Sequence, residues 1–183
     1  MAAAEALGEA LVARDCELVF GGGNLGLMGA VARTVDAGGK KVTGVIPRAL
    51  ADPEVSGSGV GEVVLVESMH ERKTTMATLA DAFIALPGGF GTLEELLEIT
   101  TWNQIGIQAK PIGVLNIPLD DGSGKGYYDP LRDMIAAAIT HGFVDDSFSE
   151  LVIFKSDPNE LLDALQAHAV PKGLDLDWGL DQS

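Results

Sequence analysis

The residues best suited to chemistry lie in the segment 85–95, which reads Ala-Leu-Pro-Gly-Gly-Phe-Gly-Thr-Leu-Glu-Glu. An apolar run ends at Pro87, a cluster of glycines follows, and a helical pattern opens at Thr92. A strand, a glycine loop and a helix N-terminus in this order offer bare backbone N–H groups and a positive dipole end to an anion. Glu94 and Glu95 would stand in the first helical turn. The segment therefore predicts a phosphate cradle beside a carboxylate, which suits chemistry on a nucleotide.

A purely structural explanation exists for part of this segment. Thr92 and Glu95 fit the capping box S/T-x-x-E, in which the Glu95 carboxylate accepts a hydrogen bond from the Thr92 N–H. This explains the spacing of the two residues but not the clustered glycines. The two roles can coexist, because a glutamate at this position would project towards whatever the loop binds. The loop lacks the lysine of a Walker A motif.

A second glycine loop spans residues 21–29, Gly-Gly-Gly-Asn-Leu-Gly-Leu-Met-Gly, and contains the pattern G-x-G-x-x-G. Three interpretations are open: contact with a mononucleotide, which we favour, a tight structural turn, or a dinucleotide site. A dinucleotide fold would want an acidic residue at the end of the next strand, about 20 residues on. That strand ends in Ile46-Pro47-Arg48, without an acid.

Cations gather at a third place, the segment Met69-His70-Glu71-Arg72-Lys73. Arg72 and Lys73 follow a predicted strand at the start of a predicted helix, where positive charge opposes the helix dipole. The chain has only 12 Lys and Arg against 27 Asp and Glu, a net charge of −15. A solvated helical face is the plain alternative. We favour an anion-binding role, because this junction should open at the same sheet edge as the glycine loops.

Composition excludes several classes of protein. A charge of −15 argues against nucleic acid or an anionic membrane as partner, and no apolar run approaches the roughly 20 residues of a membrane helix. The single Cys16 excludes an internal disulfide, and the first 13 residues lack a basic signal-peptide region, which favours a cytoplasmic protein. The three histidines are not at metal-ligand spacing, so no metal is expected.

Helical and strand patterns alternate along the chain, which predicts a doubly wound α/β fold with a parallel sheet and helices on both faces. The strands read as continuous apolar runs, as in sheets covered on both faces. We expect one domain over residues 1–169 and a flexible tail over 170–183. The expected strands are 17–20, 41–46, 62–66, 82–86, 111–115 and 151–154. The expected helices are 3–13, 25–37, 69–79, 92–105, 128–140 and 157–168, the last with Asp157 as N-cap before Pro158.

In combination these motifs resemble the LONELY GUY family, the cytokinin-activating phosphoribohydrolases. The signature P-G-G-x-G-T-x-x-E is matched over residues 87–95, G-G-G-x-x-G-L-M-G over 21–29, G-V-I-P over 44–47 and M-x-x-R-K over 69–73. Many relatives carry the label "lysine decarboxylase", yet nothing in the chain marks a pyridoxal-phosphate lysine. The resemblance extends from about residue 7 to residue 165.

The resemblance implies a Rossmann-like fold, a homodimer or higher homo-oligomer, and no cofactor. It implies hydrolysis of the N-glycosidic bond of adenine-type nucleoside 5′-monophosphates to free base and ribose 5-phosphate. Arg72 and Glu95 correspond to the catalytic pair. The other residues expected to contact the substrate are Gly89, Phe90, Gly91 and Thr92 at the phosphate, with Lys73, Glu94, Thr101, Glu54, Gly22 and Gly23 around them.

The chain departs from the family at its start. Members usually begin with a strand and a further Gly/Ser-rich loop, whereas this chain starts inside the helix that follows them, so the N-terminal strand is expected to be missing. A nucleotide or cofactor carrier on the same fold, similar to molybdenum-cofactor carriers, is the main alternative. A third hypothesis, an NADP-binding oxidoreductase using Arg48, rests on the G-x-G-x-x-G pattern alone.

Overall fold

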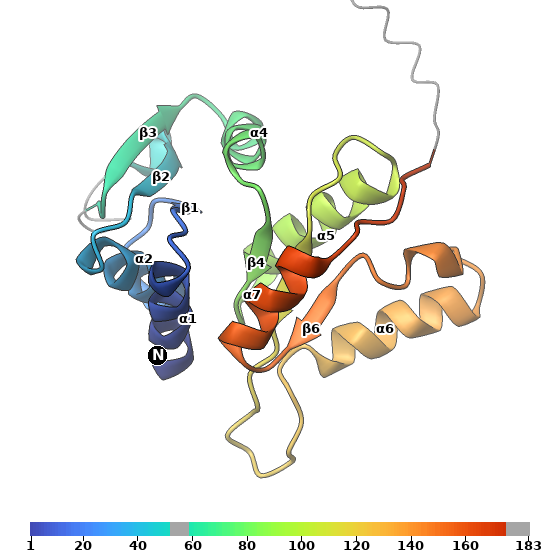
Figure 1. Cartoon of the computed structure of the whole chain (residues 1–183). Helices are drawn as coiled ribbons and strands as arrows, with labels where there is room; N and C mark the ends of the chain where they lie inside the picture. Colours follow the sequence, from blue (N-terminus) through green and yellow to red (C-terminus); the bar gives the residue numbers. More distant parts are fainter. Residues whose placement is uncertain (52–58, 175–183) are drawn as a thin grey trace, which may run out of the picture. The chain divides into compact units, whose positions relative to one another are not determined.

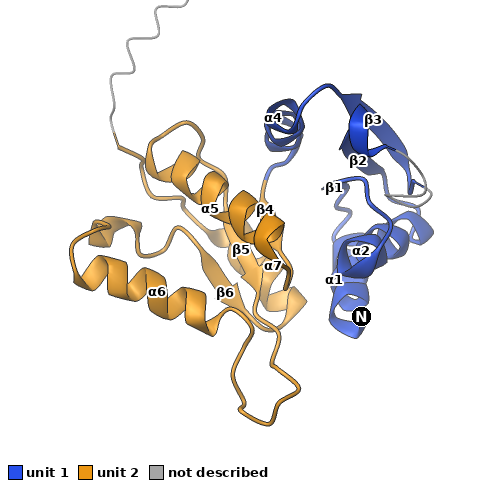
Figure 2. Ribbon diagram, turned by 180° about the vertical axis from the view of Figure 1, so that it is seen from behind, with its two compact units in different colours: residues 1–81 blue, residues 82–183 orange. Residues whose placement is uncertain are grey.

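The computed structural model describes residues 1–51 and 59–174 (Figure 1). The chain divides into two compact units, Met1–Asp81 and Ala82–Ser183 (Figure 2). Each unit is an α/β structure around its own three-stranded parallel sheet. Glu54, an expected substrate contact, lies outside the described residues.

Unit 1 builds its sheet in the order β1-β2-β3, with Leu18 opposite Val42 and Val45 opposite Val64. Helices α1 and α2 pack closely, since a Cβ on Gly8 would stand 2.6 Å from the Cβ of Thr34. The elements are α1 (Ala2–Ala13), β1 (Leu18–Phe20), α2 (Gly26–Ala37), β2 (Val42–Pro47), the 3-10 helix η1 (Arg48–Leu50), β3 (Glu62–Val66) and α4 (Met69–Leu79).

Unit 2 builds its sheet in the order β4-β5-β6. Successive residues of a strand face opposite sides of the sheet. On β5, Ile112 and Val114 enter the core beneath α5 and α6, while a Cβ on Gly113 would stand 2.7 Å from Leu161 of α7. Helices therefore cover both faces of this sheet. The elements are β4 (Phe83–Ala85), α5 (Phe90–Gln104), β5 (Ile112–Leu115), α6 (Asp129–Thr140), the 3-10 helix η2 (Asp146–Phe148), β6 (Ile153–Lys155) and α7 (Pro158–Ala167).

The predicted fold class is confirmed: parallel strands alternate with helices in a Rossmann-like arrangement. Every expected helix and strand is present, with boundaries within about two residues. The expected N-cap of α7 is also confirmed, because the Asp157 carboxylate accepts hydrogen bonds from the N–H groups of Asn159 (2.8 Å) and Glu160 (3.0 Å). The single domain over residues 1–169 and the shared edge for both glycine loops stay predictions.

The prediction that all strands are covered on both faces is wrong for β3. Strands β2 and β5 are buried along their whole length, but Val63 and Leu65 of β3 are 45% and 43% exposed. Val63 and Leu65 are alternate residues and so lie on one face of β3, and this face is open to solvent. An apolar run does not distinguish this position from a central strand.

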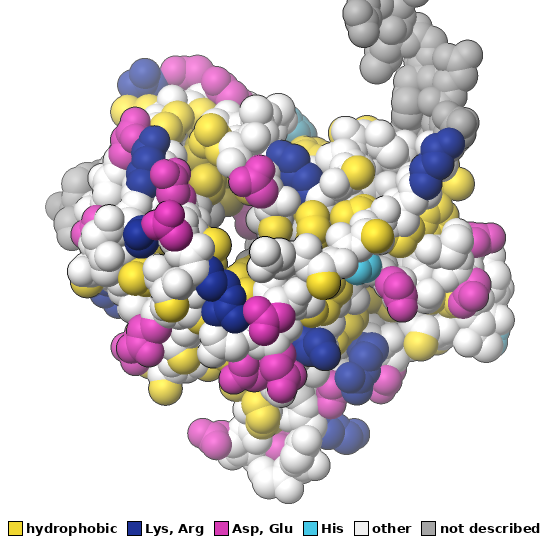
Figure 3. All heavy atoms as spheres, in the orientation of Figure 1, with side chains coloured by type: hydrophobic (Ala, Val, Ile, Leu, Met, Phe, Trp, Pro, Cys, Tyr) yellow, Lys and Arg dark blue, Asp and Glu magenta, His cyan; other side chains and the backbone are white. Residues whose placement is uncertain are grey.

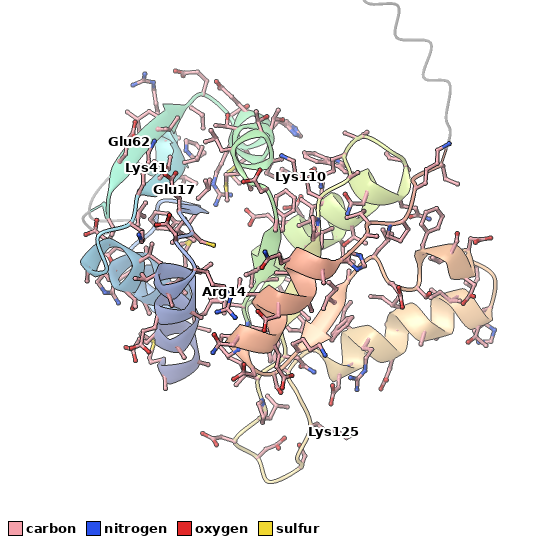
Figure 4. All side chains as sticks on the ribbon, viewed as in Figure 1. Arg14, Glu17, Lys41, Glu62, Lys110 and Lys125 are labelled. Atoms are coloured by element: carbon pink, nitrogen blue, oxygen red, sulfur yellow. The ribbon has the colours of Figure 1, made fainter. Side chains whose placement is uncertain are left out.

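Positive and negative side chains are mixed on the face shown in Figure 3, where Lys and Arg side chains stand among Asp and Glu side chains on each unit. Lys41 and Glu62 form one such exposed pair, with 3.4 Å between Nζ and the carboxylate, and they lie side by side in Figure 4. Among the described residues, no helix has the length and apolar character to cross a bilayer, and no cluster of His, Cys, Asp and Glu could hold a metal ion.

Candidate active-site loops

The glycine loop of unit 2, residues 86–91, leads from β4 into α5. The helix begins at Phe90 with Gly89 as N-cap, two residues before the predicted start at Thr92. Consequently α5 has no acidic residue in its first turn, and Glu95 belongs to the second. The predicted capping box is wrong, since no side chain caps this helix end. Phe90 and Gly91 belong to the helix because its first hydrogen bond runs from the Leu93 N–H to the Gly89 carbonyl, at 3.1 Å.

This loop leaves its N–H groups available. Within the described part of the chain, the N–H groups of residues 89–92 find no hydrogen-bond acceptor. Gly89 has φ −88° and Gly91 is helical, so neither needs the left-handed conformation that favours glycine. A Cβ on either residue would meet no described atom within 4 Å. The fold gives no reason for these two glycines, and a ligand that approaches the backbone would give one.

Two tyrosine hydroxyls hold the loop from its other side. Tyr127 donates to the Gly88 carbonyl and Tyr128 to the Leu86 carbonyl, each at 2.5 Å. The rings meet edge to face, with centroids 5.0 Å apart. Tyr128 is 1% exposed, and burial raises the pKa of its hydroxyl to about 12, with a smaller contribution from Tyr127. It is therefore a protonated donor throughout the physiological range.

A polar network fixes the tyrosines on the loop between β5 and α6. The Tyr128 N–H donates to the Asn116 side chain at 2.6 Å, and Asn116 Nδ2 donates to Asp129 at 2.8 Å. The other Asp129 oxygen accepts from the Gly126 N–H at 2.9 Å. These hydrogen bonds, that of Asn116 first, lower the pKa of the Asp129 carboxyl below its usual value. Sequence inspection missed all of these residues, because an apolar pattern says nothing about where a hydroxyl points.

The other expected site residues of unit 2 lie on α5. Phe90 is 92% exposed at the first helical position, Glu94 is exposed and Glu95 is half-buried. Thr101 is exposed two turns further on, and its hydroxyl donates to the Leu97 carbonyl at 2.8 Å. Thr92 packs on Gly88, where a Cβ would overlap its hydroxyl. Gly88 is thus required by the packing of the loop itself.

The glycine loop of unit 1, residues 21–25, is filled by its own chain. Gly22 has φ +80°, and a Cβ there would also stand 3.0 Å from Ile46. Arg33 of α2 donates to the Asn24 carbonyl at 2.8 Å and to the Asn24 side chain. Gly22 is buried and Gly23 half-buried. The backbone conformation and packing account for Gly22, and its contact with a substrate stays a prediction.

Arg72 lies against this loop. Its Nε donates to the Val45 carbonyl of β2 at 3.1 Å, and a Cβ on Gly21 would overlap its Nη2. Arg72 therefore occupies the space that a side chain at position 21 would take. Its neighbour Lys73 is half-buried.

Helix α4, which carries Arg72, has a capping box at its N-terminus, formed by Ser68 and Glu71. The Ser68 hydroxyl accepts from the Glu71 N–H at 3.1 Å, and the Glu71 carboxylate accepts from the Glu67 N–H at 2.7 Å. The signal S-x-x-E is present in the sequence at 68–71, although it was not among the predicted features. These bonds define the first turn of α4 and hence the position of Arg72.

Arg48, the residue of the NADP hypothesis, is engaged elsewhere. Its Nε lies 2.7 Å from the Glu67 carboxylate in an exposed ion pair. A 2′-phosphate would have to displace this carboxylate.

The expected site residues are divided between the two units. Gly22, Gly23, Arg72 and Lys73 belong to unit 1, and Gly89, Phe90, Gly91, Thr92, Glu94, Glu95 and Thr101 belong to unit 2.

Two strand–glycine loop–helix junctions on parallel sheets define the class of protein: a Rossmann-like α/β protein with a loop suited to a phosphate group. The family model described as "Possible lysine decarboxylase" matches residues 28–165. The chain belongs to this family, the LONELY GUY family.

Two relatives from Oryza sativa subsp. japonica illustrate the similarity. The chain is 48% identical over 167 residues to a probable cytokinin riboside 5′-monophosphate phosphoribohydrolase, covering 91% of this chain and 66% of the relative. It is 47% identical over 176 residues to a cytokinin riboside 5′-monophosphate phosphoribohydrolase, covering 96% and 70%. The chain thus spans about two thirds of the length of these relatives.

Among solved structures, the chain is similar to a molybdenum cofactor binding protein from the phototrophic bacterium Rippkaea orientalis. The TM-score is 0.65 at 19% identity, over 91% of this chain and 85% of that one. This likeness concerns the fold alone.

Proposed function

We propose that this protein hydrolyses the N-glycosidic bond of adenine-type nucleoside 5′-monophosphates, including cytokinin riboside 5′-monophosphates. Water adds its hydroxyl to C1′ of the ribose and a proton goes to the departing base, so the products are free base and ribose 5-phosphate. The observation that carries this proposal is the 47% identity over 176 residues with a cytokinin riboside 5′-monophosphate phosphoribohydrolase.

The loop at the start of α5 supports the phosphate end of the proposal. It offers four N–H groups, on residues 89–92, at the positive end of a 15-residue helix. Gly89 and Gly91 keep the approach to these groups open. Phosphate binding far from the reacting carbon supplies energy to orient the nucleotide, so a substrate without phosphate should react poorly.

Glu95 and Arg72 are the proposed catalytic residues. Cleavage of a glycosidic bond develops positive charge on the sugar ring, which a carboxylate stabilises. Glu95, half-buried on the second turn of α5, can do this or accept a proton from the attacking water. The Arg72 guanidinium, fixed by the Val45 carbonyl, can donate charge-assisted hydrogen bonds to the nucleotide.

The family resemblance supports further substrate contacts and a homo-oligomer, and the composition supports a location in the cell. Lys73, Glu94, Thr101, Glu54, Gly22 and Gly23 would complete the contacts with the nucleotide. A homodimer or larger homo-oligomer is proposed on the family resemblance, and light scattering on the purified protein would test it. A cytoplasmic location is proposed because a single cysteine suits a reducing compartment.

The direct test is incubation with AMP, with N6-isopentenyladenosine 5′-monophosphate and with the corresponding unphosphorylated riboside, followed by chromatography for free base. Base release is expected from the monophosphates and far less from the riboside. Glu95→Gln should lower kcat/KM by roughly 10²–10⁴-fold, the range typical of a lost acid–base group. Glu160→Gln, an exposed carboxylate on α7, is the matched control and should retain full activity.

Two outcomes would contradict the proposal. Base release that is unaffected by Glu95→Gln would remove the assigned role of Glu95. Tight retention of the nucleotide without any turnover would point instead to the carrier function considered as the main alternative.

A further inference from the structure

The chain contains only two tyrosines, and both hydroxyls bind the same loop. Tyr127 reaches the Gly88 carbonyl from 39 residues away in sequence, and Tyr128 reaches the Leu86 carbonyl from 42. Neither carbonyl takes part in the ladder between β4 and β5, whose register ends at Ala85. The tyrosines therefore satisfy the carbonyl groups that β4 leaves behind as the chain turns into α5.

A bond to the Gly88 carbonyl has a consequence for the next N–H group. The peptide unit between Gly88 and Gly89 is planar and trans, since the described chain has no cis peptide. Its carbonyl and its N–H point in opposite directions. A hydroxyl that holds the Gly88 carbonyl on one side thus directs the Gly89 N–H to the other side. That N–H is the first of the four that the loop leaves without an acceptor.

We propose that Tyr127 is a positioning residue: by holding the Gly88 carbonyl it aims the Gly89 N–H, and with it the loop, at the phosphate group of the substrate. This rests on the proposed function for the identity of the substrate, but concerns its phosphate group only. Tyr128 holds the Leu86 carbonyl and forms part of the core, whereas Tyr127 is 37% exposed and contributes to the loop rather than to the core.

Backbone hydrogen bonds hold the segment that carries Tyr127. The Tyr127 N–H donates to the Ile117 carbonyl at 2.9 Å. The Leu119 N–H donates to the Lys125 carbonyl, so the two hydrogen bonds close a hairpin over residues 117–127. Figure 1 shows this loop as a long excursion between β5 and α6, and Figure 4 labels Lys125 on it. A support of this kind places the hydroxyl before any ligand arrives, which reduces the ordering cost of binding.

Tyr127→Phe is the informative variant, because it removes one oxygen atom from a half-exposed ring. We expect the Kd of ribose 5-phosphate, measured by calorimetry on the whole chain, to rise about tenfold, while the Kd of unphosphorylated adenosine stays within twofold. In turnover of AMP, KM should rise by a similar factor with kcat nearly unchanged. Thr140→Val is the matched control, since it also deletes a hydroxyl that donates to a backbone carbonyl in unit 2, at 2.9 Å from Ala136 O.

The outcomes separate this inference from the proposed function. Weaker ribose 5-phosphate binding in Tyr127→Phe, with no base release even by the unmodified protein, would uphold the positioning role and reject the hydrolase. Unchanged ribose 5-phosphate binding, or an equal loss for adenosine, would overturn the positioning role and leave the hydrolase standing. A fall in melting temperature without any change in Kd would also overturn it, because the hydroxyl would then serve stability alone.

Discussion

The two glycine loops differ in what occupies the space beside their glycines. In unit 1, the place of a Gly21 side chain is taken by Arg72, and Gly22 adopts φ +80° against Ile46. In unit 2, Gly89 and Gly91 have ordinary backbone angles and open space. A glycine motif can thus serve the chain's own packing or the approach of a ligand.

This difference assigns separate roles to loops that look alike in sequence. The loop of unit 1 is a packed support that fixes the guanidinium of Arg72, and Arg33 fastens it to α2. In the loop of unit 2, Tyr127 and Tyr128 hold the Gly88 and Leu86 carbonyl groups, and among the described residues the N–H groups of residues 89–92 have no acceptor. We infer that substitutions in the first loop act through Arg72, whereas those in the second act on phosphate binding.

Among substitutions in the two glycine loops, Gly21→Ala should have the largest effect. The added methyl would push the end of the Arg72 side chain aside, and a displacement of about 1 Å in a catalytic group can cost roughly 10²-fold in rate. The displaced atoms belong to a flexible side chain, so the loss of unfolding free energy should stay below about 1 kcal/mol. Steady-state kinetics beside thermal unfolding would check both. Full activity would mean that Arg72 is not needed where it lies.

Gly91→Ala should separate stability from binding. Alanine in place of glycine at a helical position stabilises by about 0.5–1 kcal/mol, so the melting temperature should rise. The methyl would nonetheless enter the open space of the loop and raise the KM for AMP about tenfold, which corresponds to roughly 1.4 kcal/mol. Kinetics and thermal unfolding on the same sample would test this. Unchanged KM with higher stability would show that the open space has no ligand.

Sequence patterns predicted the succession of helices and strands well because apolar periodicity reports burial. They located the start of α5 less well, since Thr92 and Glu95 matched a capping box that the structure does not form. The same pattern at Ser68 and Glu71 is the one that caps a helix. Motif spacing alone cannot choose between the two, because the choice depends on whether the glycines before Thr92 continue the helix.

The candidate site was predicted in part. The glycines and Arg72 were visible because their residue types are unusual in those places. Tyr127 and Asn116 were not, because their role depends on contacts with residues about 40 and about 12 positions away in sequence, at Gly88 and Tyr128. Long-range hydrogen bonds of this kind leave no local pattern.

Arg33→Met should have a smaller effect on stability and KM. It removes the hydrogen bonds between α2 and Asn24 of the unit 1 loop and leaves the contacts of Arg72 unchanged. Loss of the hydrogen bonds to Asn24 should lower the unfolding free energy by only about 0.5 kcal/mol, because the pair is exposed. Urea unfolding would measure it. The KM for AMP should change less than in Gly91→Ala. A larger rise in KM would break the distinction between a supporting loop and a binding loop.

The smallest expected effect concerns the loss of stability at low pH, to which one carboxylate of each unit should contribute. The pKa of Asp129 is lowered first by its hydrogen bond from Asn116, and that of Asp15, in unit 1, by Lys40. A lowered pKa means that the unfolded chain binds more protons than the folded one, so stability is present above about pH 4 and is lost as pH falls through the folded-state value. Both carboxylates should therefore contribute to acid unfolding.

Only Asp129 belongs to the network that carries the tyrosines. Asp129→Asn should flatten the acid limb of the unfolding curve and also weaken ribose 5-phosphate binding at neutral pH, because the Asn116 side chain loses its charged partner. Asp15→Asn should flatten the acid limb to a similar extent and leave that binding unchanged, since its partner Lys40 lies in unit 1. Acid titration followed by calorimetry on both variants would test this pairing. Unchanged ribose 5-phosphate binding in Asp129→Asn would mean that the network does not reach the loop, and equal weakening in both variants would mean that the effect is not specific to the network.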